Sequence, residues 1–217
     1  MIKVPKVHNP KYYNHIAGQR LVRIEALSDG IFAIAMTLLV LDLKVPINLL
    51  IHSEQQLWVA LIQLGPNFLS YFLGFLTLGI FWLGHSSQFT FIVKGDRNLN
   101  WLSIFFLLFV SLVPFSTALL SQYIAFKLAI GMYWLNILAL GISIYLHWHY
   151  AYTHKLVSQT YEVRIVDKAI RRRVVIAQIL YAASTALCFI STYLSITCIV
   201  LVQLNYALAP SFNRSKR

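Results

Sequence analysis

Charged side chains are scarce in this sequence, and acidic ones most of all. Only 12% of its 217 residues are Asp, Glu, Lys or Arg, and seven of these are acidic. A soluble domain of this length usually carries about 25% charged residues. Hydrophobic residues instead make up 59% of the chain. The composition therefore excludes an ordinary soluble domain and predicts an all-α integral membrane protein.

Cysteines and catalytic clusters are equally sparse. The two cysteines, Cys188 and Cys198, lie in apolar sequence without metal-ligand spacing, which favours plain buried residues over a disulfide. The acidic residues are scattered, and the chain shows no Ser/His/Asp set and no phosphate-binding glycine loop. We therefore expect neither an enzyme nor a cofactor.

The net charge of +11 comes from basic residues placed between apolar runs. Basic residues in the loops between spans are typical of membrane proteins, where they set the orientation of the chain in the bilayer. A nucleic-acid-binding protein would instead gather its basic residues on one folded face. The longest polar segment, His154–Arg173, is interpreted as a loop, and its final run Arg171–Arg173 as a contact with anionic lipid headgroups. The expected partners are membrane lipids, with neither nucleic acid nor a soluble protein.

The stretch Arg23–Pro46 is the predicted first span. Its segment Ala26–Leu43 would form a helix of about 27 Å, close to the ~30 Å thickness of a bilayer core. Between Ala26 and Leu41 its only ionisable residue is Asp29. Inserting a carboxylate into the membrane at the centre of a helix costs about 2.5–3.5 kcal/mol. Because Arg23 lies nearly two turns away, we expect a partner for Asp29 on another helix.

Breaks in the apolar pattern divide the rest of the chain. Gly65-Pro66 marks the start of a helix, and the polar cluster 191–193 is the best break in an uncharged run of 35 residues. The predicted later elements are a lead-in at 57–64 and spans at 66–93, 101–123, 125–150 and two within 174–208.

Charge counting favours six spans. With six, both termini share one side with sixteen of the eighteen Lys and Arg, leaving Lys44 and Lys127 opposite. By the positive-inside rule that side is cytoplasmic. The predicted organisation is an N-terminal cytoplasmic segment 1–22, a six-helix transmembrane domain 23–209 and a basic cytoplasmic tail 210–217.

An apolar stripe runs along the first span. Ile34, Leu38 and Leu41 fall at i, i+4 and i+7, with Thr37 on the flank and Asp42 at the outer end. The stripe is interpreted either as a lipid-facing or packing surface, or as a constriction built from several copies around an axis. The spacing alone favours the lipid-facing or packing surface.

Polar residues near Asp29 allow a proton relay, a cation site or a structural contact, and the structural contact is favoured. Trp82 and His85, three residues apart on the second span, are candidate partners at matching depth. The segment His147–His149 at the end of the fourth span is interpreted as interfacial belt residues rather than a metal site.

The string Arg23-Ile-Glu-Ala-Leu-Ser28-Asp29-Gly30, followed by Thr37-Leu38-Leu39, resembles the first helix of a known family. That family comprises the prokaryotic relatives of the lysosomal potassium channel called transmembrane protein 175. The resemblance implies a homotetramer of six-span subunits whose first helices line a central, potassium-selective pore. The resemblance also implies that the pore lacks the carbonyl-lined selectivity filter of ordinary potassium channels. In agreement, the chain contains no TVGYG-like segment.

The resemblance also implies roles for individual residues. Four would form the pore constriction, with a hydroxyl and backbone carbonyl from the threonine: Ile34, Thr37, Leu38 and Leu41. Six would form the network that braces the pore helix: Arg23, Ser28, Asp29, Trp82, His85 and Ser103. Asp42 would lie at the outer pore mouth. Leu27 replaces the usual Phe of the motif, and Ser103 stands where an Asn is expected.

We therefore predict a passive potassium channel without a cofactor, K+ being only the permeant ion. The alternatives are a proton-conducting channel or a secondary transporter that uses Asp29 and His85. A transporter would show inverted repeats and interrupted helices, whereas the strong breakers Gly65-Pro66 and Pro114 are not symmetrically placed.

Overall fold

A computed structural model describes residues 20–46 and 51–208, and in these ranges the chain is almost entirely helical. The elements in order are α2 (Leu21–Leu38), the 3-10 turn η1 (Leu39–Asp42), α3 (Glu54–Gln63), α4 (Gly65–Phe89), α5 (Arg97–Ser111), α6 (Val113–Gln122), α7 (Lys127–Thr153), α8 (Tyr161–Ala186), η2 (Leu187–Phe189) and α9 (Thr192–Leu208). Residues 1–19 of the predicted N-terminal segment and the whole predicted tail 210–217 lie outside the described residues.

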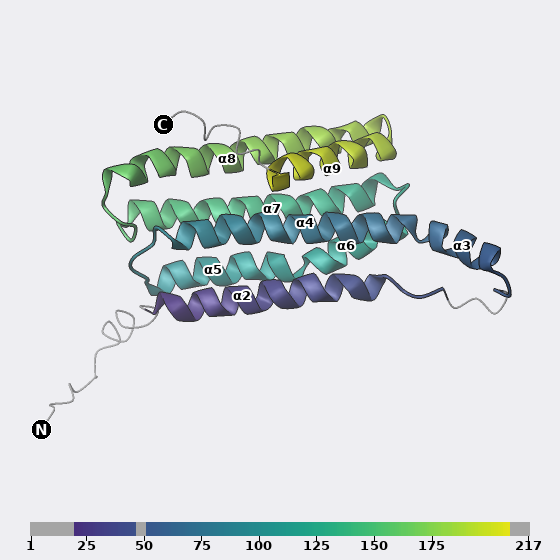
Figure 1. The fold of residues 1–217 in the computed structure, drawn as a ribbon. Coiled ribbons are helices and arrows are strands. Elements are labelled where there is room, and N and C mark those ends of the chain that lie inside the picture. The colour runs from purple at the N-terminus through teal and green to yellow at the C-terminus, as the bar shows by residue number, and fades with distance from the viewer. Residues whose placement is uncertain (1–19, 47–50, 209–217) are drawn as a thin grey trace, which may run out of the picture.

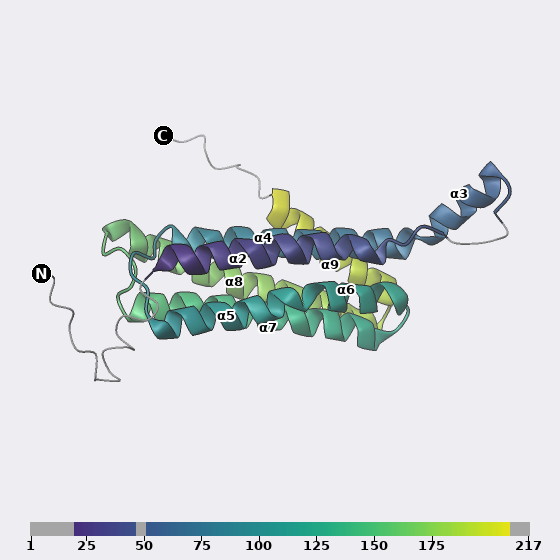
Figure 2. The same ribbon diagram turned by 90° about the horizontal axis from the view of Figure 1, so that it is seen from below.

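The long helices form an elongated bundle (Figures 1 and 2). α2, α5 and α8 begin at the same end of the bundle, where α4 and α7 finish, and α3 projects from the opposite end. Five segments are long and apolar enough to cross a membrane, namely Leu21–Asp42, Gly65–Phe89, Arg97–Gln122, Lys127–Thr153 and Glu162–Phe189. α9 is a shorter apolar helix of 17 residues, or about 25 Å.

α9 packs into the bundle through a buried polar contact. Gln203 donates from Nε2 to Thr77 Oγ1 of α4 (2.7 Å) and to the Tyr133 hydroxyl of α7 (2.9 Å). Thr77 Oγ1 and the Tyr133 hydroxyl lie 2.7 Å apart. Because the three side chains are buried, these contacts fix the position of α9 along its neighbours.

The predicted break at Gly65-Pro66 is confirmed, since α3 ends at Gln63 and Pro66 lies in the first turn of α4. A second break separates α5 from α6 at Leu112, just before Pro114. Proline has no N–H to donate, so a helix loses a backbone bond there. The side-chain amide of Asn136 on α7 is oriented so that both its nitrogen and its oxygen are hydrogen-bonded. Its nitrogen donates to Phe109 O (3.2 Å), and its oxygen accepts from Ser116 Oγ (3.1 Å). Asn136 thereby stabilises the interrupted backbone.

The interpretation of His154–Arg173 as a loop is wrong from Tyr161 onward, where α8 begins. Val163, Val166 and Ile170 recur at helical spacing and pack against a buried cluster around Trp148. This apolar face extends α8 well beyond its uncharged part. The predicted break in the run 174–208 is confirmed, because η2 ends at Phe189 and α9 begins at Thr192.

The interpretation of His147 and Trp148 as interfacial belt residues is also wrong. Both are fully buried. Trp148 donates from Nε1 to Asp167 Oδ1 of α8 at 2.9 Å, and the His147 ring packs against Phe89 of α4. The folding back of α8 covers this end of α7, which the fourth span alone could not reveal.

Gly74 lies where α4 passes close to η1 and α6. A Cβ atom placed there would lie 2.8 Å from Leu39 Cδ2 and 3.0 Å from Thr117 Cγ2, whereas one at Gly79 would meet nothing within 4 Å. We expect Gly74→Val to lower the free energy of unfolding by about 1–3 kcal/mol through overpacking. Gly79→Val, on the same helix, is the matched control. Thermal unfolding in detergent measures both, and equal stability of the two variants would contradict the close approach.

Candidate functional site

α2 has one covered and one uncovered face. Its buried side chains recur every three to four residues: Ile24, Ser28, Phe32, Ala35 and then Leu39 of η1. Ile34 is 60% exposed, Leu38 43% and Leu41 66%. The predicted apolar stripe therefore lies on the face of α2 that its own subunit leaves uncovered.

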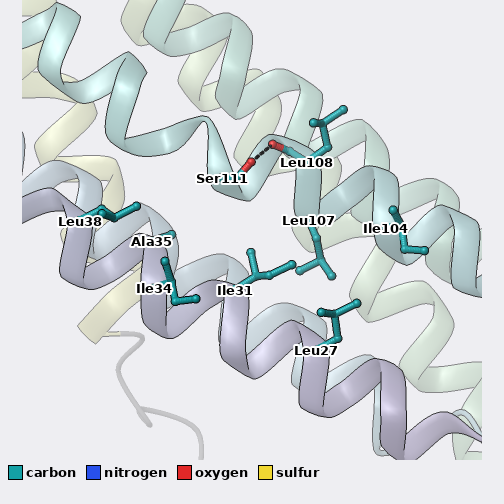
Figure 3. Close-up of a pocket in the computed structure, with 9 residues that line it drawn as sticks. All are labelled: Leu27, Ile31, Ile34, Ala35, Leu38, Ile104, Leu107, Leu108 and Ser111. Atoms are coloured by element: carbon teal, nitrogen blue, oxygen red, sulfur yellow. Dashed lines mark hydrogen bonds between the residues drawn. The ribbon is translucent and has the colours of Figure 1, made fainter.

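Part of this stripe lines a groove between α2 and α5 (Figure 3). The groove has a volume of about 350 Å³, and its wall is almost wholly apolar. The lining residues are Leu27, Ile31, Ile34, Ala35 and Leu38 of α2 with Ile104, Leu107, Leu108 and Ser111 of α5. Its one polar side chain, Ser111, donates its hydroxyl to Leu108 O at 2.7 Å (Figure 3). The rest of the surface can pack against apolar chains or exclude water.

Thr37 and Asp42 lie beside the stripe. Thr37 is exposed and donates its hydroxyl to Ile34 O at 2.8 Å, so its oxygen retains only acceptor capacity. Asp42 is half-buried at the end of η1. Its backbone carbonyl accepts a hydrogen bond from Asn67 Nδ2 of α4 at 3.3 Å. This bond connects the end of the first span to the start of the second.

Asp29 finds its partner on the second span. Trp82 of α4 donates from Nε1 to Asp29 Oδ1 at 2.9 Å. Both residues line a small cavity of about 260 Å³ between α2 and α4, together with Glu25, Ser28, His85, Ser86, Phe89 and Thr90. Trp82 thus supplies the interhelical donor that a carboxylate at this depth requires.

The other residues of the predicted network are placed differently. Ser28 Oγ donates to Ile24 O (2.8 Å) and Ser103 Oγ to Leu99 O (3.1 Å), so each hydroxyl bonds its own helix. The side chain of Arg23 is exposed, and within the described ranges it makes no hydrogen bond or ion pair. Among the six residues, the structure joins only Asp29 and Trp82 by a hydrogen bond.

His85 lines the same cavity but belongs to a buried aromatic cluster. Its ring stacks on Phe106 (centroids 4.7 Å apart) and lies 5.2 Å from the ring of His147. His147 Nδ1 is 2.7 Å from Gln88 Oε1, and Gln88 Nε2 donates to Ile144 O at 3.1 Å. Since an amide oxygen only accepts, His147 must carry its proton on Nδ1. This cluster joins α4 to α5 and α7.

Sequence reasoning missed Gln88 and His147 as members of this cluster. A signal was available, because Gln88 follows His85 by three residues and a polar side chain within a membrane helix needs a partner. The identity of that partner depends on the packing of α7 against α4, which no spacing in the sequence states.

The described residues contain no group of three or more His, Cys, Asp or Glu side chains that could hold a metal ion. Their two cysteines, Cys188 and Cys198, are free. The fold and the site together define a multi-pass helical membrane protein. Its polar side chains join helices, and its first helix keeps an uncovered apolar face.

Comparison with known proteins places this chain in a family. The model of the family described as endosomal/lysosomal potassium channel TMEM175 matches residues 23–114. A potassium channel from Streptomyces collinus is 34% identical over 189 residues, which are 85% of this chain and 90% of that protein. The chain therefore belongs to the TMEM175 family.

A solved structure and a vertebrate relative extend the comparison. The crystal structure of a lysosomal potassium-selective channel TMEM175 homolog from Chamaesiphon minutus has a TM-score of 0.75 at 32% identity, covering 87% of this chain and 96% of that one. The endosomal/lysosomal proton channel TMEM175 of Gallus gallus is 38% identical over 108 residues, which are 46% of this chain and 21% of that protein. The chain is thus a member of an ion channel family and not an enzyme.

Proposed function

We propose that this chain is the subunit of a potassium channel and that its pore is lined by α2 in a homotetramer. The observation that carries the proposal is the uncovered stripe of α2 and η1, on which Ile34 and Leu41 are each at least 60% exposed. The described residues of one subunit leave this stripe uncovered. Several copies arranged around an axis would enclose a central route and would cover the stripe.

In such a pore the apolar side chains would form successive rings. Ile34, Leu38 and Leu41 would produce a narrow, poorly wetted constriction that selects by size and by the cost of removing water from the ion. Thr37 would add an acceptor oxygen close to these rings. Asp42, one per subunit, would raise the local cation concentration at the outer mouth.

Asp29 and Trp82 would support the pore without touching ions. Their hydrogen bond joins α2 to α4, which is itself held to α7 and α9 by the buried contacts of Thr77. This chain of contacts would fix the rotation of α2 and therefore the direction in which its stripe faces. His85 would add packing at the same depth, and Arg23, Ser28 and Ser103 would contribute less than the resemblance implies.

We further propose six crossings, with α9 as the sixth, and both termini on the cytoplasmic side. The Lys and Arg distribution supports this topology, because sixteen of eighteen then lie on one side. The segments 1–22 and 210–217 would be short cytoplasmic extensions of the transmembrane domain 23–209.

The test is a reversal potential in planar bilayers that contain the purified protein, with potassium on one side and sodium on the other. We expect a shift toward the potassium equilibrium potential. Near-zero current, with transport only under a proton or substrate gradient, would contradict the channel and favour a secondary transporter. Protein-free bilayers provide the baseline.

Proton conduction is the second candidate, favoured by one feature of the site. Asp29 and His85 line a common cavity, and the His85 ring lies 5.2 Å from that of His147. A proton current through these groups would persist when potassium and sodium are replaced by impermeant ions under a pH gradient. The absence of such a current would remove this candidate.

A further inference from the structure

A second groove lies between α7 and α8. In the bundle, α8 lies on the side away from α2 (Figure 1). The volume of the groove is about 360 Å³, and its lining is almost wholly apolar. The residues that line it are Leu138, Gly141, Ile142, Tyr145 and Leu146 of α7 with Val174, Val175, Gln178, Ile179 and Ala182 of α8. Since α2 is the proposed pore helix, this groove would face lipid.

Each of the two polar side chains of the groove makes a hydrogen bond within the protein, and Gln178 Oε1 is buried without a partner. Gln178 packs over Gly141, where the missing side chain leaves room, and donates from Nε2 to Ile137 O at 3.3 Å. The Tyr145 hydroxyl accepts from Arg171 Nη1 at 3.2 Å. The free surface of the groove therefore suits a hydrocarbon chain better than a polar ligand.

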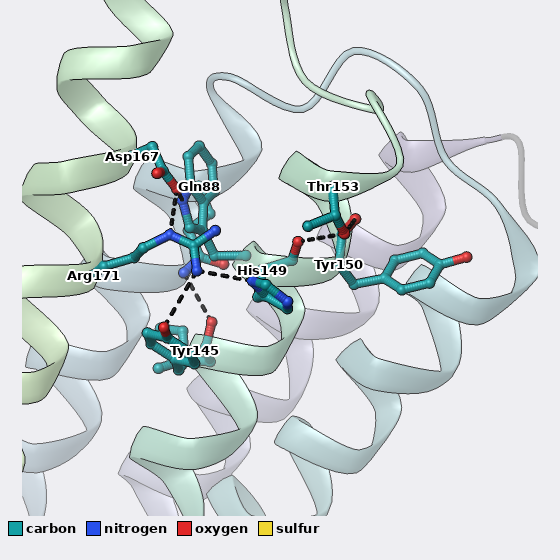
Figure 4. A network of polar contacts seen from close by, with 9 residues as sticks. Gln88, Tyr145, His149, Tyr150, Thr153, Asp167 and Arg171 are labelled. Atoms are coloured by element: carbon teal, nitrogen blue, oxygen red, sulfur yellow. Dashed lines mark hydrogen bonds and ion pairs between the residues drawn. The ribbon is translucent and has the colours of Figure 1, made fainter.

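Arg171, three residues before the first groove residue of α8, contacts the groove residue Tyr145 (Figure 4). Its Nε donates to Asp167 Oδ1 at 2.6 Å, and its Nη1 lies 2.8 Å from His149 Nδ1. The guanidinium carbon also lies 5.5 Å from the centroid of the Tyr145 ring. Arg171 is thus used to hold α7 and α8 together.

Two basic residues, Lys168 and Arg172, lie near Arg171 on the face of α8 that carries the groove residues. Lys168 and Arg172 precede the groove residues Val175 and Ile179 by seven positions each, and residues three, four or seven apart share a helix face. Both side chains are exposed, and within the described part of the chain neither side chain makes a hydrogen bond or an ion pair. Beyond Arg173 no charge occurs until Arg214.

We propose that this groove binds an anionic phospholipid, with one acyl chain along α7 and α8 and the phosphate at Lys168 and Arg172. The change from basic to uncharged sequence at Arg173 marks the level at which α8 enters the hydrocarbon core. Headgroup and acyl chain therefore meet the basic and apolar parts of one continuous face. Arginine and lysine bind phosphate oxygens by charge-assisted hydrogen bonds. The proposal does not depend on which ion the channel conducts.

The first experiment compares lipid retention by native mass spectrometry of the full chain purified with phosphatidylglycerol or phosphatidylcholine of matched acyl chains. We expect selective retention of phosphatidylglycerol, and a loss of at least about fivefold in Lys168→Gln/Arg172→Gln. Arg173→Gln is the matched control, because Arg173 lies over the Tyr206 ring of α9 at 5.5 Å, on another face of α8. An equal loss in the control, or none in the double variant, would overturn the site.

The second experiment tests the apolar part of the site. Ala182 lines the groove, whereas its neighbour Ala183 is exposed outside it. Ala182→Trp should reduce phosphatidylglycerol retention and Ala183→Trp should leave it unchanged. Unchanged retention in Ala182→Trp would overturn the role of the groove. Dissociation of the assembly by Ala182→Trp alone would also overturn it, because the groove would then be a contact between subunits.

Discussion

Replacing Leu38 by alanine should raise potassium conductance severalfold and move the reversal potential between potassium and sodium toward zero. Leu38 lies on the uncovered face of α2, 43% exposed, between Ile34 and Leu41. In a pore built from α2, its truncation in every subunit would widen one ring of the constriction. A wider, better wetted ring lets partly hydrated ions pass and discriminates less between them.

The matched control is Leu201→Ala. Leu201 is an exposed leucine of α9, so its truncation removes the same atoms from a surface that the proposal places against lipid. Single-channel recordings in planar bilayers measure both variants. If Leu38→Ala forms a folded assembly whose conductance and selectivity match the parent protein, the assignment of the stripe to the pore is wrong.

Removing the contact between Asp29 and Trp82 should destabilise the protein and alter gating while leaving potassium selectivity intact. The 2.9 Å bond from Trp82 Nε1 to Asp29 Oδ1 joins α2 to α4. A hydrogen bond to a carboxylate is worth about 1.5–3 kcal/mol where water is excluded. Because both side chains are partly exposed in the subunit, we expect a coupling energy of about 1–2 kcal/mol.

A double-mutant cycle of Asp29→Ala and Trp82→Phe measures that coupling through unfolding in detergent. Trp101→Phe is the control, because Trp101 is an exposed tryptophan of α5 whose ring lies beside that of Phe105 on the same helix. Additive effects of the two changes would contradict the contact. Asp29→Asn separates the candidate functions. The structural role predicts retained ion current with changed gating, whereas a proton relay predicts loss of proton flux.

Much of the fold follows from local features of the sequence. Apolar runs of about 20 residues predict the helices that are long enough to cross a membrane. Gly65-Pro66 predicts a break because proline cannot continue a hydrogen-bonded helix. The polar residues 191–193 predict the break that follows Phe189. The same local view failed for 161–173, where the basic residues suggested a loop although Val163, Val166 and Ile170 follow the helical period.

The candidate site divides in the same way. The stripe Ile34, Leu38 and Leu41 is visible as a spacing, and Asp29 is visible as a carboxylate that needs a partner. Which of several donors would meet Asp29 was not visible. The structure selects Trp82, leaves Arg23 exposed, and directs His85 toward Phe106 and His147.

The sequence by itself determined the class of this protein, the presence of its long apolar helices and the asymmetry of its basic residues, because each depends on local composition and periodicity. Only the tertiary structure decided which face of each helix is covered. In a membrane protein, the faces that contact lipid and the faces that contact other helices are both apolar, so hydrophobic periodicity does not distinguish them. The uncovered face of α2, the burial of Trp148 against Asp167 and the bond between Trp82 and Asp29 all depend on how the helices align in space.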